Sequence, residues 1–356
     1  MTIQQKLMNL VMVLLIAVTI IATGLLYGVK DLHAIAENYR SETEEVTAGM
    51  SVMDLLRNNS SIVASEEGPN HEGQLRLEIP FYVSAEEITI EEDYVKHQVR
   101  IRIPSIDGTY FYDYPMVGSC DHITDLLYDS IKGEGIIDVE LDGVYELETE
   151  WEDKYLYLGF EDPHELYDYI VVVDAGHGGN DVGARISGTN EKDVNLKIVQ
   201  DMKGLFDNDV QNIGVFYTRL DDRFVSLEDR VALSNDVGAD LFISVHNNST
   251  ASGRISSING TEVMYKVSDE SGKSKEFADR CLDNLLTKLG SLSKGVVAGD
   301  DIYILRTSNA PVALVEVGFM TNQLERLMLE NEEYQHMAAE AMHTAVWEML
   351  YSMEEE

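Results

Sequence analysis

The hydrophobic period of the chain changes at about residue 169, and this change most limits what the C-terminal half can fold into. From there on, short apolar runs alternate with longer stretches in which apolar residues recur every three or four positions. The short runs predict strands and the longer stretches predict helices. Strand and helix in alternation predict an α/β domain, with a mostly parallel, twisted sheet and helices on both faces. The predicted strands are residues 169–174, 213–218, 241–246, 261–267 and 312–317, and the predicted helices are residues 191–206, 226–237, 274–289 and 332–351.

The preceding part of the chain has the period of β-structure. Apolar and polar residues alternate in three segments, broken by Gly, Asp and Pro, which predicts a small β-sandwich-like module. These segments are residues 74–83, 87–104 and 136–160, and a short helix is predicted at residues 122–131. The expected organisation is a transmembrane helix (1–30), an acidic stalk (31–73), a β-rich module (74–162) and a C-terminal domain (163–356).

The N-terminal segment predicts attachment to a membrane. Residues 7–29 contain no charged side chain, and about 20 apolar residues suffice for a helix to cross a bilayer. We favour an uncleaved signal anchor, although the small residues at 34–36 leave a cleaved secretory signal open. The expected location is therefore the cell membrane, single-pass with the C-terminal domain extracytoplasmic, or secretion after cleavage.

Charge and cysteine content exclude several classes of protein. With 64 acidic and 26 basic residues, the net charge of −38 argues against nucleic acid as a partner. Cys120 and Cys281 lie far apart in the sequence and are expected to be unpaired thiols. Because no Cys-x-x-Cys pair exists, any metal has to be held by histidines and carboxylates.

Four residues able to bind a metal or move a proton lie at the ends of predicted elements. His177 follows the strand "VVVDA" in a turn of glycines, and His246 follows the strand "ADLFISV". Glu316 lies in the apolar run "VALVEVGF", and Glu191 begins the first long helix. Because ligands of α/β sheets bind at the carboxyl ends of the strands, we expect these four side chains to meet.

Together these residues fit a catalytic zinc site. Two imidazoles and one carboxylate can hold zinc and leave a position for water, while a second glutamate serves as general base. Each residue alone has a simpler interpretation. The histidines are common in turns and cores, and Glu191 suits a helix N-terminus. That simpler interpretation is weakest for Glu316, since a carboxylate in an apolar run is costly to bury without a partner.

The order and spacing of these motifs resemble the zinc-dependent N-acetylmuramoyl-L-alanine amidases of bacterial cell-wall turnover, the Amidase_3 type. The resemblance covers about residues 169–351 and includes "VVVDAGHGG", "GTNEKDVNL", "ADLFISVHNN" and "APVALVEVGFMTN". It implies that His177, Glu191 and His246 bind zinc and that Glu316 is the catalytic glutamate. It also implies a six-stranded sheet and hydrolysis of the amide between N-acetylmuramic acid and L-alanine in peptidoglycan.

Further expectations concern the surroundings of the four residues and the partners of the protein. Asp174 and Asn195 are expected to orient the ligands, and a protein activator or a division protein is an expected partner. Lys294 stands where the family commonly has arginine. Some members have an inserted helix over the zinc, but residues 247–300 leave room for only a strand and one helix, so none is expected here.

Two other functions stay open from the sequence. The same zinc set suits a peptidase that cuts within the stem peptide, and a catalytically idle scaffold could bind the wall. For the β-rich module, both wall binding and a role as spacer remain open.

Overall fold

The computed structural model describes residues 73–118 and 120–354. These residues belong to one compact unit, Glu66–Glu356. No helix among them is long and apolar enough to span a bilayer. The predicted transmembrane helix and nearly all of the predicted stalk lie outside the described residues.

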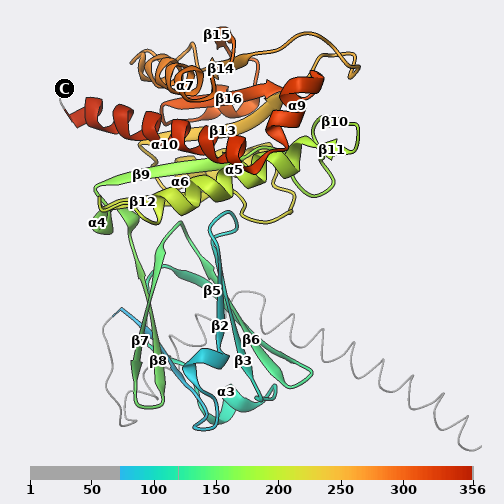
Figure 1. The fold of residues 1–356 in the computed structure, drawn as a ribbon. Helices are drawn as coiled ribbons and strands as arrows, with labels where there is room; N and C mark the ends of the chain where they lie inside the picture. The colour runs from blue at the N-terminus through green and yellow to red at the C-terminus, as the bar shows by residue number, and fades with distance from the viewer. Residues whose placement is uncertain (1–72, 119, 355–356) are drawn as a thin grey trace, which may run out of the picture. The chain divides into compact units, whose positions relative to one another are not determined.

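A six-stranded sheet forms the centre of the C-terminal domain (Figure 1). Its strand order is β12-β9-β13-β16-β14-β15, and all neighbours are parallel except β14 and β16. The mostly parallel sheet is thus confirmed, while the short, largely exposed edge strand β15 was not predicted. The strands are β9 (Tyr169–Ala175), β12 (Ile213–Tyr217), β13 (Leu241–Asn248), β14 (Thr261–Tyr265), β15 (Ser293–Ala298) and β16 (Val312–Phe319).

Helices cover both faces of this sheet. Alternate residues of each central strand enter different cores: Val245 packs with one set of helices, and Phe242 packs with the other. Burial on both faces explains why the strands are nearly continuous apolar runs. The first set is α5 (Glu191–Phe206), α7 (Lys273–Leu289) and α10 (Glu332–Glu354), and the second is α6 (Leu227–Asp236) and α8 (Tyr303–Thr307).

Local sequence sets where several helices begin and end. The Ser226 hydroxyl accepts a hydrogen bond from the backbone N–H of Asp229 at 3.1 Å, which caps the start of α6. The side chain of Asn322 caps α9 (Gln323–Leu329) in the same way. Helix α7 ends at Gly290, whose φ of 64° suits glycine.

The β-rich module contains two antiparallel four-stranded sheets, ordered β4-β1-β8-β7 and β2-β3-β6-β5. Its strands are β1 (Leu75–Glu78), β2 (Thr89–Asp93), β3 (Gln98–Pro104), β4 (Val117–Gly118), β5 (Ile123–Ile131), β6 (Glu134–Leu141), β7 (Glu146–Glu152) and β8 (Tyr155–Glu161). Buried and less buried positions alternate along β3 and β6, as they do in a strand with one face toward a core.

The helix predicted at residues 122–131 is wrong, because this segment is strand β5. It pairs with β6, and the register shifts between Ile123 and Asp125. This irregularity places buried Ile123 and Leu126 three positions apart, which is a helical spacing.

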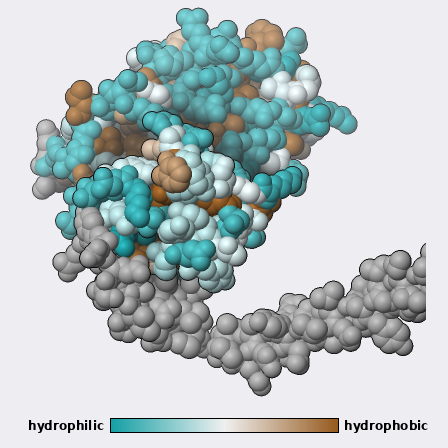
Figure 2. Space-filling view, turned by 90° about the horizontal axis from the view of Figure 1, so that it is seen from below, coloured by the Kyte–Doolittle hydropathy of each residue, from teal (hydrophilic) through white to brown (hydrophobic). Residues whose placement is uncertain are grey.

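The surface and the two cysteines agree with what the charge and the cysteine content predict. Hydrophilic residues cover most of the coloured face in Figure 2, and the apolar residues there lie singly or in small groups. Cys120 and Cys281 are both buried free thiols, as expected. Burial raises the pKa of the Cys281 thiol well above its ordinary value.

Candidate functional site

The structure brings the four predicted residues to one end of the sheet. His177 follows β9, His246 lies near the end of β13, and Glu191 is the first residue of α5. Glu316 lies in β16 directly beside His246 of the neighbouring strand. The structure therefore brings His177, Glu191 and His246 together and places Glu316 next to His246 in the sheet.

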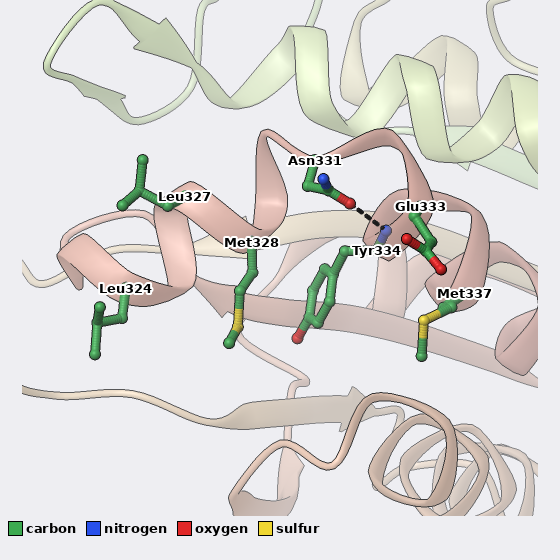
Figure 3. A pocket seen from close by; sticks show the side chains of 7 residues that line it. All are labelled: Leu324, Leu327, Met328, Asn331, Glu333, Tyr334 and Met337. Atoms are coloured by element: carbon green, nitrogen blue, oxygen red, sulfur yellow. Dashed lines mark hydrogen bonds between the residues drawn. The ribbon is translucent and has the colours of Figure 1, made fainter.

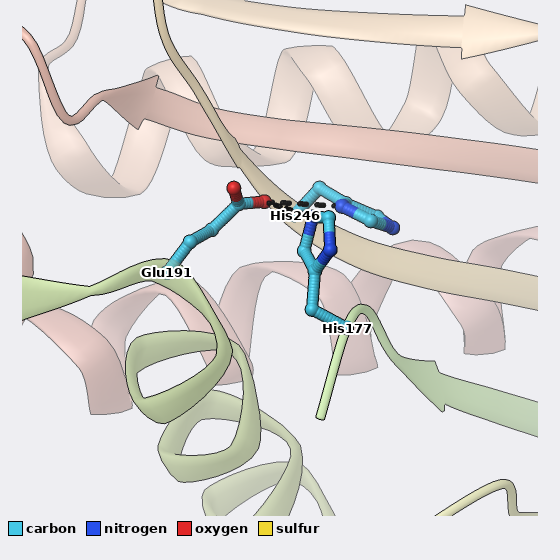
Figure 4. A group of neighbouring side chains, drawn as sticks. All are labelled: His177, Glu191 and His246. Atoms are coloured by element: carbon cyan, nitrogen blue, oxygen red, sulfur yellow. Dashed lines mark hydrogen bonds and ion pairs between the residues drawn. The ribbon is translucent and has the colours of Figure 1, made fainter. Parts of the chain in front are cut away.

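His177, Glu191 and His246 converge on one point (Figure 4). The Glu191 Oε1 atom lies 3.1 Å from His177 Nε2 and 3.1 Å from His246 Nδ1. One ligand atom from each residue lies within 4.8 Å of the others. Within residues 73–118 and 120–354, this is the one group of three or more His, Cys, Asp or Glu side chains that converges in this way. We call it the triad.

Glycines around His177 leave the space that the side chains of the triad occupy. A Cβ atom on Gly176 would lie 2.3 Å from the imidazole of His246, so only glycine lets that ring pack against the turn. Gly183 has a φ of +62°, and a Cβ there would lie 2.6 Å from the carboxylate of Glu191. His177 itself has a φ of 62°, a left-handed conformation that is uncommon for a residue with a side chain.

Asp181 fixes the orientation of His177. Its Oδ2 atom lies 2.9 Å from His177 Nδ1, on the side of the ring away from Glu191. Although burial acts in the opposite direction, hydrogen bonds to Glu191 and Asp181 raise the pKa of His177 to about 9. Asp181 was not predicted, although its position four residues after His177, in the same glycine turn, is a signal that the sequence contains.

Glu191 is held as an anion. Its residue exposure is 5%, and burial alone would raise its pKa. Hydrogen bonds from the two histidines outweigh that effect and lower the pKa well below its ordinary value. The backbone N–H groups of Ala184 and Asn247 also donate to the carboxylate, at 2.8 and 3.1 Å.

Asn195 and Asp174, which were expected to orient the ligands, form hydrogen bonds with residues around the triad and not with the triad side chains. Asn195 donates to the carbonyl of Gly176 at 3.1 Å and accepts from the side chain of Asn247 at 2.8 Å. Asp174 is fully buried and accepts hydrogen bonds from Thr218, Ser244 and Arg230. The hydrogen bonds of Asp174 are thus made to the framework behind the triad.

Two buried arginines, not predicted, bind the backbone of the glycine turn. Arg219 donates to the carbonyls of Ala175 and Gly176 at 2.8 and 2.9 Å. Arg230 donates to the carbonyls of Ala175 and His177, both at 2.7 Å. Because each guanidinium holds several carbonyls at once, the turn that presents His177 has little freedom to move.

Glu316 has the environment of a proton acceptor. The residue keeps some exposed surface, but its Oε2 atom is buried without a hydrogen-bond partner. Burial raises its pKa well above the ordinary value, and the negative charges of Glu191 and Glu262 act in the same direction, against His177. A carboxylate that is buried without a partner takes up a proton more readily than an exposed one, which suits a general base.

A hollow elsewhere on the domain does not involve this chemistry. It has a volume of about 510 Å³ and lies at α9 and the start of α10 (Figure 3). Its lining residues are Leu324, Leu327, Met328, Asn331, Glu333, Tyr334 and Met337. None of the four predicted site residues lines it, so the candidate site stays with the triad and Glu316.

Comparison with known proteins agrees with the resemblance seen in the motifs. Residues 171–348 match the Amidase_3 family, described as N-acetylmuramoyl-L-alanine amidase. The uncharacterized protein YqiI of Bacillus subtilis is 37% identical over 172 residues, which cover 48% of this chain and 80% of YqiI. The N-acetylmuramoyl-L-alanine amidase LytC of the same organism is 34% identical over 173 residues, 49% of this chain but only 34% of LytC.

A solved structure, an N-acetylmuramoyl-L-alanine amidase from Clostridium difficile 630, is 32% identical, with a TM-score of 0.49. The match covers 52% of this chain and 97% of that structure. The family match spans half of the sequence and includes the triad and Glu316. This chain therefore belongs to the N-acetylmuramoyl-L-alanine amidase family.

Proposed function

We propose that this protein is a zinc-dependent peptidoglycan hydrolase that cleaves the amide between N-acetylmuramic acid and the L-alanine of the stem peptide. The observation that supports the proposal most directly is the triad beside Glu316, in a domain of the amidase family. Family membership supports the substrate and the bond, and the arrangement of the site supports the roles of the residues.

The donor set of the triad fits zinc. Two imidazole nitrogens and one carboxylate oxygen are the protein ligands of many catalytic zinc sites. His177 Nε2, His246 Nδ1 and Glu191 Oε1 would hold the ion, since these atoms already face one another. When bound, zinc supplies Lewis acidity toward the attacking water and the scissile carbonyl.

Glu316 is the general base in this proposal. It takes a proton from the water that attacks the lactyl carbonyl and passes it to the nitrogen of the departing alanine. Its raised pKa suits this role, because burial makes the carboxylate a stronger proton acceptor than an exposed one. Asp181 acts through His177: it binds Nδ1 of the ring and so keeps Nε2 directed toward Glu191.

We also propose that the enzyme works outside the cytoplasm, attached to the cell membrane. The uncharged, apolar run at residues 7–29 and the peptidoglycan substrate support this location.

Digestion of purified peptidoglycan by the full chain tests the function. We expect free stem peptides with new L-alanine amines by mass spectrometry, abolished by a chelator and restored by zinc. Cuts within the stem peptide would instead identify a peptidase. If zinc binds but nothing is released, either the enzyme requires a protein activator or the chain is a wall-binding scaffold.

The variant Glu316→Gln tests the base. It keeps the size of the side chain but cannot take the proton, so we expect zinc content near wild type and a loss of hydrolysis of at least about 100-fold. The exposed residue Glu228 supplies the matched control Glu228→Gln. Hydrolysis by Glu316→Gln at the rate of this control would rule out Glu316 as the base.

A further inference from the structure

Glu262 continues the candidate site across the sheet. His246, Glu316 and Glu262 are direct neighbours on β13, β16 and β14. Side chains in register on adjacent strands share a face, so the three form a row. Two residues along each strand, on the same face, Leu314 and Met264 pack in the core that α6 and α8 cover, whereas the three residues of the row are partly exposed.

No side-chain contact among the described residues gives Glu262 a structural role. Its backbone pairs with β15 and β16, but among the described residues its side chain makes no hydrogen bond or ion pair. On its other side the row meets Gly295 of β15. A Cβ atom built on Gly295 would have no atom within 4 Å, so the surface beyond Glu262 is open.

The order of the row predicts how a substrate would lie. Glu316 is placed between His246, a member of the triad, and Glu262. If the scissile carbonyl faces the triad and Glu316 protonates the nitrogen, that nitrogen lies on the Glu262 side. The peptide that follows it would then cross the open surface at Gly295.

We propose that Glu262 is the residue that recognises the nitrogen side of the substrate, an inference that rests on the proposed function. Its carboxylate accepts hydrogen bonds from N–H groups of the stem peptide before cleavage. In cleavage, the hydroxyl of water joins the lactyl carbon and the C–N electron pair goes to nitrogen. That nitrogen takes one proton from Glu316 and a second from solvent. The resulting L-alanine ammonium pairs with Glu262.

Peptide binding tests this assignment without relying on hydrolysis. The probes are L-alanyl-D-glutamate and its N-acetylated form, titrated by calorimetry into the zinc-loaded full chain. In Glu262→Gln, we expect the free-amine peptide to bind about tenfold more weakly, because a charge-assisted contact is lost. The N-acetylated peptide should change by less than about twofold. Glu228→Gln, which removes the charge of an exposed side chain on α6, should bind both peptides as the wild type does.

Three results would overturn the assignment. Equal weakening of both peptides would rule out pairing of Glu262 with the alanine ammonium and leave it only the peptide N–H groups, and unchanged binding of both would show that it contacts neither peptide. A loss of zinc from Glu262→Gln would make it a support of the metal site instead. Failure of the wild type to release stem peptides from peptidoglycan would count against the proposed function, and the binding comparison separates that result from a failure of Glu262.

Discussion

Asp181 and Glu191 flank the ring of His177 and hold a proton on it. Each carboxylate lies within about 3 Å of one ring nitrogen, and together they raise the pKa of His177 to about 9 despite its burial. At neutral pH the metal-free site therefore contains an imidazolium between two carboxylates. Zinc must displace that proton, because only the neutral ring can bind a metal.

The stability of the protein should therefore depend on pH in opposite ways with and without zinc. A folded-state pKa of about 9, above the ordinary 6.5, stabilises the metal-free fold fully below pH about 6.5. That contribution, on the order of 1–3 kcal/mol, is lost as the pH rises toward 9. Zinc affinity should instead increase over the same range. Thermal unfolding with chelator and with zinc, from pH 6 to 9, measures both; parallel curves would contradict the role of His177.

Asp181→Asn should weaken zinc binding without unfolding the domain. The amide can still contact His177 Nδ1 but lacks the charge that polarises the ring toward a metal. Loss of such a supporting carboxylate typically lowers metal affinity 10–100-fold. Competition with a chromophoric chelator measures the change, and Asp221→Asn, at an exposed residue, is the control. If both variants bind zinc as the wild type does, Asp181 has no part in the site.

Among the elements, helix α6 and strand β9 are joined by a buried ion pair behind the triad. Arg230 and Asp174 have side-chain exposures of 3% and 0%. The pKa of Asp174 is held low, because its contacts with Arg230, Ser244 and Thr218 outweigh the cost of its burial. The same arginine donates to the carbonyl of His177, so one side chain connects the helix, the strand and the turn that presents His177.

Arg230→Met should destabilise this assembly strongly. It leaves the charge of Asp174 buried without its partner, which typically costs about 3–5 kcal/mol. The double variant Arg230→Met with Asp174→Asn should recover part of that loss, because the uncompensated charge is gone. Urea unfolding of the wild type, the single variants and the double variant measures the difference. If the double variant is no more stable than Arg230→Met, the buried charge is not the cause.

The elements that the sequence predicted are those whose local pattern matches their final environment. The central strands are apolar because both faces are buried, and α5 was predicted with its observed bounds, Glu191–Phe206. Strand β5 was misread because its register shift gives an apolar spacing typical of a helix. Edge strand β15 was missed because little of it is buried.

The residues of the candidate site also fall into those that local sequence predicts and those that it does not. His177, Glu191 and His246 were predictable because they lie near the ends of elements, where ligands of this fold bind. Glu316 was predictable because a carboxylate is unusual in an apolar run. Arg230 was not predictable, because the carbonyls it binds come together only in the folded turn. Glu262 was not predictable because its neighbour Glu316 is set by strand register, which no local pattern in the sequence encodes.

At the scale of the whole molecule, the β-rich module and the C-terminal domain share contacts within one compact unit. Tyr94 of the module packs edge-on against buried Phe216 of β12, with ring centroids 4.9 Å apart. Asp93 accepts a hydrogen bond from Arg223 at 2.8 Å, and Val144 enters the core under α6. These contacts lead us to expect that the two parts unfold together.

Replacing Tyr94 by alanine should uncouple the two parts. The change removes the ring from Phe216 and exposes apolar surface of β12, so we expect a loss of about 2–4 kcal/mol and an unfolding transition that broadens or splits. The matched control is Tyr112→Ala, since Tyr112 lies on the module with 83% of its surface exposed. Calorimetry of the wild type should show one transition, as should the control. Two separate transitions in the wild type would mean that the contact between the module and the C-terminal domain contributes nothing to stability.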